Sequence, residues 1–155
     1  MKIAYTMTEG KGDLDQVLYR FAKDEMARGT HVVGVVQVNT DREDCPLCDM
    51  DVEVLPDGPT IRISQDLGPE AKGCRLDPDA LELAVVEVGN RLKSDIGLLV
   101  LNKFGKHEAN GRGFRDTIGQ AMALDVPVVC GVNALNREAF EAFSEGTAKY
   151  VEPTP

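Results

Sequence analysis

Three continuous apolar runs most constrain the fold of this chain: "HVVGVVQV" (31–38), "IGLLVLN" (96–102) and "VPVVCGV" (126–132). Unbroken runs of this length, rich in β-branched residues, are typical of strands buried on both faces inside a parallel sheet. Parallel strands need long crossover connections, which are usually helices. Helical patterns do separate the runs, so the chain is predicted to form an α/β sandwich with a mostly parallel sheet.

Periodicity and capping residues divide much of the remaining chain into helices. Asp13 and Asp77 are the predicted N-caps of two helices, and Gly29 is predicted to end the first one. The expected helices cover 14–28, 78–93, 114–124 and 136–143. Because strands and helices alternate, the crossover between parallel strands is expected to be right-handed.

Shorter strands and loops complete the predicted order. A first strand is expected at 2–7 and a last edge strand at 148–152. Residues 50–65 alternate in polarity around "PDGP", which predicts a β-hairpin inserted at the edge of the sheet. The segments 39–49 and 66–76 are predicted to be irregular loops. A single domain of residues 1–155 is expected, with a frayed tail at 152–155.

The chain is acidic, with a net charge of −9 at pH 7, yet its positive charge is concentrated in one segment. Residues 102–115 hold four cations and one anion, so this segment carries +3 and the rest of the chain −12. Nucleic acids and anionic membranes are bound through many Lys and Arg side chains, so neither is an expected partner. The small basic segment instead favours a small anionic ligand.

The expected compartment is the cytoplasm, since the first strand is preceded by no signal peptide and no apolar stretch could span a membrane. In that compartment cysteines are reduced or bind metal. Cys45 and Cys48 form a CxxC and, with Cys74, are a candidate site for zinc or another transition metal. Further ligands would have to come from His31 or His107. Cys130 lies in an apolar run and is predicted to be in the core.

Ligands of open α/β sheets bind outside the carboxyl ends of the strands. The loops at 8–13, 102–113 and 133–136 are all predicted to lie at that edge. The second loop places lysines just after a strand and arginines at the first turn of the next helix, where a helix N-terminus favours an oxyanion. Its cations are Lys103, Lys106, Arg112 and Arg115. The alternative is a solvated basic loop that pairs with the acidic surface.

The first loop, "TMTEGKGDLD" (6–15), has part of the pattern of a phosphate-binding P-loop. Gly10 and Lys11 match the end of GxxxxGK[ST], but Gly12 stands where Ser or Thr would hold magnesium, and the upstream glycine is absent. Two interpretations stay open: a tight strand-to-helix turn, and a degenerate loop that faces a phosphate. Asp13 would repel a phosphate, so hydrolysis of Mg-ATP by this loop alone is not expected.

The strand at 96–102 ends in Asn102, where a Walker B strand ends in Asp, and Glu108 lies six residues further on. The segment "NKFGKHE" (102–108) resembles the "DEIGKME" signature of the small thermophilic-type nucleoside-triphosphatases of the P-loop class. Lys106 and Glu108 match that signature, whereas Asn102, Lys103 and His107 depart from it. The triphosphatase carboxylates therefore carry over only at Glu108, and there only in part.

The chain is similar over nearly its whole length to a related bacterial family of uncharacterised function, whose genes often lie beside molybdate-transport genes. The similar segments are "GVVQ", "ISQDLG", "GCRLD", "LNKFGKHEANGRGFRD" and "PVVCGV", in this order. The resemblance implies a three-layer P-loop NTPase-like sandwich with a mostly parallel sheet and an inserted hairpin. It implies no activity, because the family has none established.

The favoured hypothesis is a nucleotide- or phosphate-binding protein with weak or absent hydrolysis, linked to molybdenum through the resemblance. If the protein is an enzyme, it is expected to be a nucleoside-triphosphatase, with Glu108 and His107 as catalytic candidates; His107 is alternatively an ordinary loop histidine. The candidate ligand contacts are Gly10, Lys11, Gly12, Asn102, Lys103, Lys106, Arg112 and Arg115.

Mg²⁺ with a nucleotide, molybdate and zinc are the candidate cofactors. The alternatives are a non-catalytic accessory protein that binds molybdate or a metal, and a protein-interaction module. In either case a protein partner in molybdenum uptake or cofactor assembly is the candidate macromolecular partner.

Overall fold

The computed structural model describes residues 3–7, 13–42, 45–63, 77–104, 106–109, 111–132, 136–144 and 149–150. The strands are β1 (Ile3–Thr6), β2 (Val32–Arg42), β3 (Cys45–Leu55), β4 (Thr60–Arg62), β5 (Leu98–Phe104), β6 (Val128–Val132) and β7 (Lys149–Tyr150). The helices are α1 (Asp13–Ala27), α2 (Pro78–Arg91), α3 (Lys106–Ala109), α4 (Arg115–Ala123) and α5 (Arg137–Phe143).

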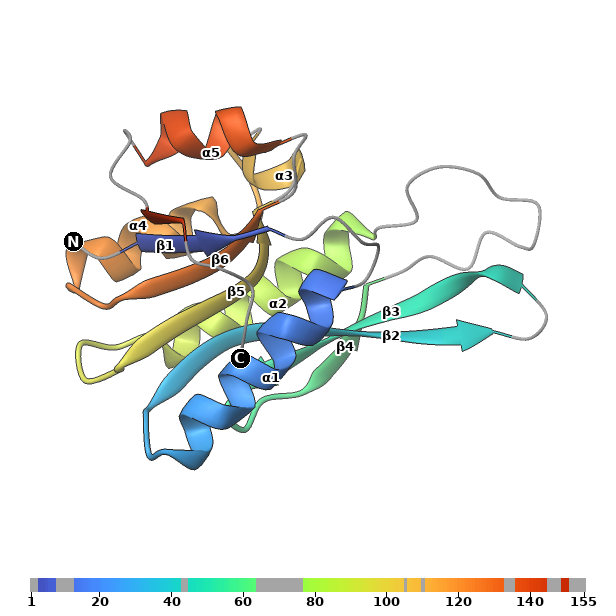
Figure 1. The fold of residues 1–155 in the computed structure, drawn as a ribbon, viewed down its shortest axis with the longest axis horizontal. Helices are drawn as coiled ribbons and strands as arrows, with labels where there is room; N and C mark the ends of the chain where they lie inside the picture. Colours follow the sequence, from blue (N-terminus) through green and yellow to red (C-terminus); the bar gives the residue numbers. More distant parts are fainter. Residues whose placement is uncertain are drawn as a thin grey trace.

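The described strands form one seven-stranded sheet in the order β4-β3-β2-β5-β6-β1-β7 (Figure 1). The pairs β2–β5, β5–β6, β6–β1 and β1–β7 are parallel, whereas β3 and β4 join β2 as an antiparallel edge. The predicted mostly parallel sheet with an inserted hairpin is therefore confirmed. The three apolar runs form β2, β5 and β6, which are neighbours in the sheet.

Helices cover both faces of the sheet, which gives three layers (Figure 1). On one face Leu18 and Ala22 of α1 are fully buried against Val36 and Val100 of the sheet. The other face packs against α2, α4 and α5, and its aromatic centre joins Tyr5, Phe104 and Phe140. Burial of these apolar surfaces is the main favourable term in folding.

Two predicted capping residues are confirmed. The Asp77 Oδ1 atom accepts hydrogen bonds from the N–H groups of Asp79 at 3.0 Å and Ala80 at 3.4 Å, so it satisfies two otherwise unpaired donors at the start of α2. Gly29 follows α1 with φ +91°, a left-handed conformation that glycine adopts without steric cost. These local signals mark where α1 ends and where α2 begins.

The prediction of a loop over 39–49 is wrong. β2 continues to Arg42, β3 begins at Cys45, and their antiparallel ladder runs from the pair Gly34–Leu55 to the pair Arg42–Cys45. Figure 1 shows this two-stranded ribbon reaching beyond the other strands. Main-chain hydrogen bonds build such a ladder without apolar side chains, so polar composition did not reveal it. A short helix, α3, likewise interrupts the predicted loop at 102–113.

The predicted loop at 66–76 and the tail at 152–155 lie outside the described residues. Within the described part of the chain, no helix is both long enough and apolar enough to cross a lipid bilayer.

Candidate functional site

The carboxyl ends of β1, β5 and β6 lie along one edge of the sheet, beside the middle of β2, and three of these strands carry polar side chains there. Thr6 ends β1, Gln37 lies in β2, and Asn102 lies near the end of β5. Helix α1, which follows the glycine loop, places Asp15 in its first turn at the same edge. Gly10, Lys11 and Gly12 lie outside the described residues, so their role stays a prediction.

Asn102 is the centre of a hydrogen-bond network that joins three elements. Asn102 is only 3% exposed. Its Nδ2 atom donates to Asp15 Oδ1 at 2.7 Å and to Gln37 Oε1 at 3.2 Å. Its Oδ1 accepts the backbone N–H of Gln37 at 3.2 Å. The network connects the start of α1 to β2 and β5, so it holds this end of α1 against the sheet.

Close backbone packing beside Asn102 depends on Gly131 of β6. Thr6 pairs with Gly131 in the β1–β6 register. A Cβ on Gly131 would overlap the main-chain oxygen of Asn102 and would lie 2.7 Å from Leu18 Cδ1. Glycine at this position therefore allows α1 and β5 to approach β6 closely.

Thr6 is the last residue of β1, directly before the loop, and is 5% exposed. Its hydroxyl has no hydrogen-bond partner among the described residues. A buried hydroxyl left unpaired costs about 1–3 kcal/mol, so groups of this kind are usually satisfied by water, protein or a ligand.

The cationic segment is spread over several environments rather than gathered at one point. Lys103 and Arg112 are exposed. Arg115 is partly buried, with its guanidinium carbon 5.0 Å from the centre of the Phe143 ring, a cation–π contact. Lys106 and His107 form the first turn of α3, and the structure does not describe their side chains.

Carboxylates of the protein itself occupy the N-terminus of α4. The N–H of Phe114 donates to Glu108 Oε2 at 3.1 Å, and the N–H of Gly113 donates to Glu82 Oε1 at 3.1 Å. Glu108 is 4% exposed, and its carboxylate fills the space where a Cβ on Gly113 would lie. The oxyanion predicted near Arg112 and Arg115 would thus have to displace two carboxylates to use these two donors. Glu108 as a catalytic group also stays a prediction.

The cysteines fall into two groups. Cys130 is fully buried, and burial together with the Glu108 charge raises the pKa of its thiol well above the ordinary value, which confirms it as a core residue. Cys45 and Cys48 belong to β3, not to a loop, and Cys74 lies outside the described residues. Among the described side chains no cluster of three or more His, Cys, Asp or Glu could hold a metal ion.

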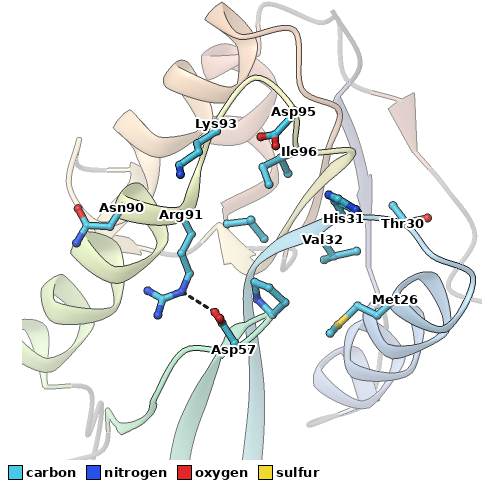
Figure 2. Close-up of a pocket in the computed structure, with 12 residues that line it drawn as sticks. Met26, Thr30, His31, Val32, Asp57, Asn90, Arg91, Lys93, Asp95 and Ile96 are labelled. Carbon is cyan, nitrogen blue, oxygen red and sulfur yellow. Dashed lines mark hydrogen bonds and ion pairs between the residues drawn. The ribbon is translucent and has the colours of Figure 1, made fainter.

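A cavity of about 480 Å³ lies at the opposite edge of the sheet, near the starts of β2 and β5 (Figure 2). Met26, Val32 and Ile96 give it apolar walls. Figure 2 shows Arg91 at its rim paired with Asp57, and the Nε–Oδ1 distance is 3.2 Å. No sequence motif pointed to this cavity, and it is distant in the topology from the loops that follow the strands.

Sequence patterns predicted Asn102 but missed Asp15, Gln37 and Thr6. Asp15 stands three residues after Gly12, in the first turn of the helix that leaves the glycine loop, and this spacing is the one signal that could have revealed it. Thr6 carried no signal beyond its place at the end of β1, and Gln37, in the middle of β2, carried none.

The sequence of this chain is similar to one protein family and to one transport protein. Residues 3–155 match the model of the family DUF2478, described as a protein of unknown function. The chain is 36% identical over 146 residues to the molybdenum import ATP-binding protein ModC 2 of Bradyrhizobium diazoefficiens. That match covers 94% of this chain but only 16% of the relative's length.

Two solved structures share the fold. THEP1 from the hyperthermophile Aquifex aeolicus superposes with a TM-score of 0.66 at 19% identity, covering 100% of this chain and 91% of THEP1. A human cancer-related nucleoside triphosphatase superposes with a TM-score of 0.69 at 16% identity, covering 98% of this chain and 88% of that one. The fold of this chain is therefore P-loop NTPase-like, as the resemblance implied.

Proposed function

Because the chain belongs to the DUF2478 family, whose function is unknown, we propose from its fold and site that it binds a nucleoside triphosphate. The proposed site is the carboxyl edge where the glycine loop joins β1 to α1. One observation carries the proposal: the start of α1, the end of β1 and the end of β5 are connected at this edge through Asn102, Gly131 and Thr6. The printed name of the relative, an ATP-binding protein, supports the same ligand.

Several physical features of this edge suit a phosphate chain, although the charge of Asp13 at the start of α1 opposes one. Helix α1 is 15 residues long, and the dipole and free N–H groups of a helix N-terminus attract anions. Lys11 precedes that helix in the sequence, and the hydroxyl of Thr6, which has no partner among the described residues, adds a donor at the end of β1. Asp15 lies at the same edge but already accepts a hydrogen bond from Asn102.

Hydrolysis is proposed to be weak or absent. In P-loop NTPases a loop Ser or Thr and a Walker B Asp hold the magnesium ion that accompanies the nucleotide. This chain has Gly12 and Asn102 at those positions, and the Asn102 amide is engaged with protein groups. These residues do not fit a magnesium site of that kind. Glu108, the remaining catalytic candidate, is buried and bonded to the α4 backbone.

Ligand-induced stabilisation tests the proposal. A ligand present at a hundred times its Kd adds about 2.7 kcal/mol to the free energy of unfolding. For a chain of this length, that raises the melting temperature by roughly 5–10 °C. We expect ATP or GTP to produce such a shift in the wild type but not in Lys11→Ala.

Lys93→Ala is the matched control, because Lys93 is an exposed cation at the opposite edge of the sheet. It should retain the shift. If neither nucleotide raises the melting temperature of the wild type, the proposed nucleotide site is wrong.

A second candidate is an accessory role in molybdenum uptake or cofactor assembly, with molybdate or a protein as partner. The name of the relative and the basic segment at 102–115 favour it. Because the match covers 16% of the length of that relative, this chain corresponds to only one part of the larger transport protein. Stabilisation by molybdate without nucleotide, lost in Arg112→Ala, would support the oxyanion form of this candidate.

A further inference from the structure

The residue at the Walker B position of this chain presents an amide, not a carboxylate, to the proposed nucleotide site. We propose that the site takes its nucleotide as the metal-free anion, and that the bonds of Asn102 to Asp15 and Gln37 replace the metal-holding carboxylate. The inference rests on the proposed function for its ligand. Its statement about the metal can be tested without that ligand.

The neighbours of Asn102 determine which way its amide points. The backbone N–H of Gln37 is only a donor, so it must face the Asn102 oxygen, 3.2 Å away. The Asp15 carboxylate is an acceptor, so it must face the Asn102 nitrogen, 2.7 Å away. Rotating the amide by half a turn would oppose donor to donor and acceptor to acceptor.

This orientation turns the nitrogen of Asn102, and not its oxygen, towards Asp15, so the pair does not suit a shared metal ion. A divalent cation binds oxygen atoms, and magnesium demands near-ideal octahedral oxygen geometry. A cation placed between Asn102 and Asp15 would meet the N–H hydrogens of the amide. The Asn102 oxygen is directed to the backbone of β2 instead.

The carboxylate absent from β5 is present on α1 as Asp15, 87 residues away in the sequence. The 2.7 Å bond to a charged acceptor is short and of the strong, charge-assisted kind. It connects the start of α1 to β5 directly. In metal-dependent P-loop sites the magnesium ion and its ligands make that connection.

Without a metal ion, the phosphate charge must be neutralised by side chains. Lys11 lies two residues before α1 in the sequence. The site is therefore proposed to depend on this lysine and on helix N–H groups, which act in the absence of divalent cations.

Metal dependence is measured in two ways with the full chain. First, we expect the Kd for ATP in EDTA to agree with that in magnesium within about twofold. Second, we expect Mn²⁺ alone, without nucleotide, to change the melting temperature of the wild type by less than roughly 1 °C. Asn102→Asp places a second carboxylate beside Asp15 and should acquire stabilisation by Mn²⁺.

Two further variants keep the test decisive. Asn90→Asp adds the same charge at an exposed position on α2 and should remain insensitive to Mn²⁺. The exchange Asp15→Asn with Asn102→Asp restores a carboxylate–amide pair with the carboxylate on β5. It should fold even if Asn102→Asp alone does not, and it should be stabilised by Mn²⁺.

A loss of ATP affinity of tenfold or more in EDTA would overturn this inference while leaving the nucleotide site in place. If ATP binds under neither condition, the proposed function fails, and the Mn²⁺ measurement still decides the metal question. Stabilisation of the wild type by Mn²⁺ that disappears in Asp15→Asn would then show that Asn102 and Asp15 do form a cation site and would refute the inference. Insensitivity of the wild type with a gain in the exchange variant would support only its statement that this pair holds no cation.

Discussion

The Glu108 carboxylate occupies the space beside Gly113 at the start of α4, and a double-mutant cycle can measure how strongly the two residues are coupled. A Cβ on Gly113 would overlap the Glu108 carboxylate, and the glycine has a left-handed φ of +63°. Glu108 cannot move away freely, because it is 4% exposed and its Oε2 accepts the Phe114 N–H at 3.1 Å. We therefore expect Gly113→Ala to displace the carboxylate from this bond.

The expected magnitude has two parts. An alanine in the left-handed conformation costs about 1 kcal/mol, and loss of a hydrogen bond to a charged group costs about 2 kcal/mol. Gly113→Ala should then lower the free energy of unfolding by about 3 kcal/mol, which corresponds to a melting temperature roughly 6–12 °C lower. In a Glu108→Ala background only the backbone part remains, so the coupling between the two sites should be about 2 kcal/mol.

Urea unfolding followed by circular dichroism on the wild type, the two single variants and the double variant gives this coupling. Gly111→Ala is the matched control, since Gly111 also has a positive φ, +87°, but a Cβ there approaches only Arg115 Nη1, at 3.9 Å. It should show the backbone cost alone. If Gly113→Ala lowers the free energy of unfolding equally with and without the Glu108 side chain, overlap with that carboxylate is refuted as the cause.

Two further outcomes follow from buried residues near the site. Gly131→Ala should lower the free energy of unfolding by about 1–3 kcal/mol in urea titrations through overlap with Asn102, whereas Gly119→Ala, with open space at its Cβ, should not be destabilising. Because burial and then the Glu108 charge raise the pKa of Cys130, its thiol stays neutral in the folded protein while the unfolded thiol ionises. Stability should therefore fall above about pH 8.5 with a slope up to roughly 1.4 kcal/mol per pH unit, and Cys130→Val should lack that part of the slope. Identical pH slopes for the two proteins would contradict this burial effect.

Most of the fold could be predicted because its signals act over short distances along the chain. A cap such as Asp77 bonds donors two and three residues away, and a C′ glycine such as Gly29 acts on the turn before it. The apolar runs show burial on both faces, and that burial requires helices on each side of the sheet. Parallel order follows from the crossover connections.

The outer part of the β2–β3 ribbon could not be predicted in the same way. Its residues from 39 to 49 are mostly polar, so neither an apolar run nor a clear alternation marks them as strands. Their pairing, which continues to Arg42 and Cys45, comes from main-chain hydrogen bonds that any non-proline residue can make. The sequence patterns that predict strands reflect the burial of apolar side chains. A ladder of main-chain hydrogen bonds can form without such burial.

The candidate site shows a related limit, because its chemistry is shared between residues that are remote in sequence. Taken alone, Asn102 indicates the loss of a metal-holding carboxylate. Taken with Asp15, it shows that a carboxylate does lie at this edge, on α1, where it accepts a hydrogen bond from the amide at 2.7 Å. A motif compared one position at a time records only the missing carboxylate of β5. The pairing of Asn102 with Asp15 becomes visible only in the fold, and it is this pairing that predicts binding independent of metal.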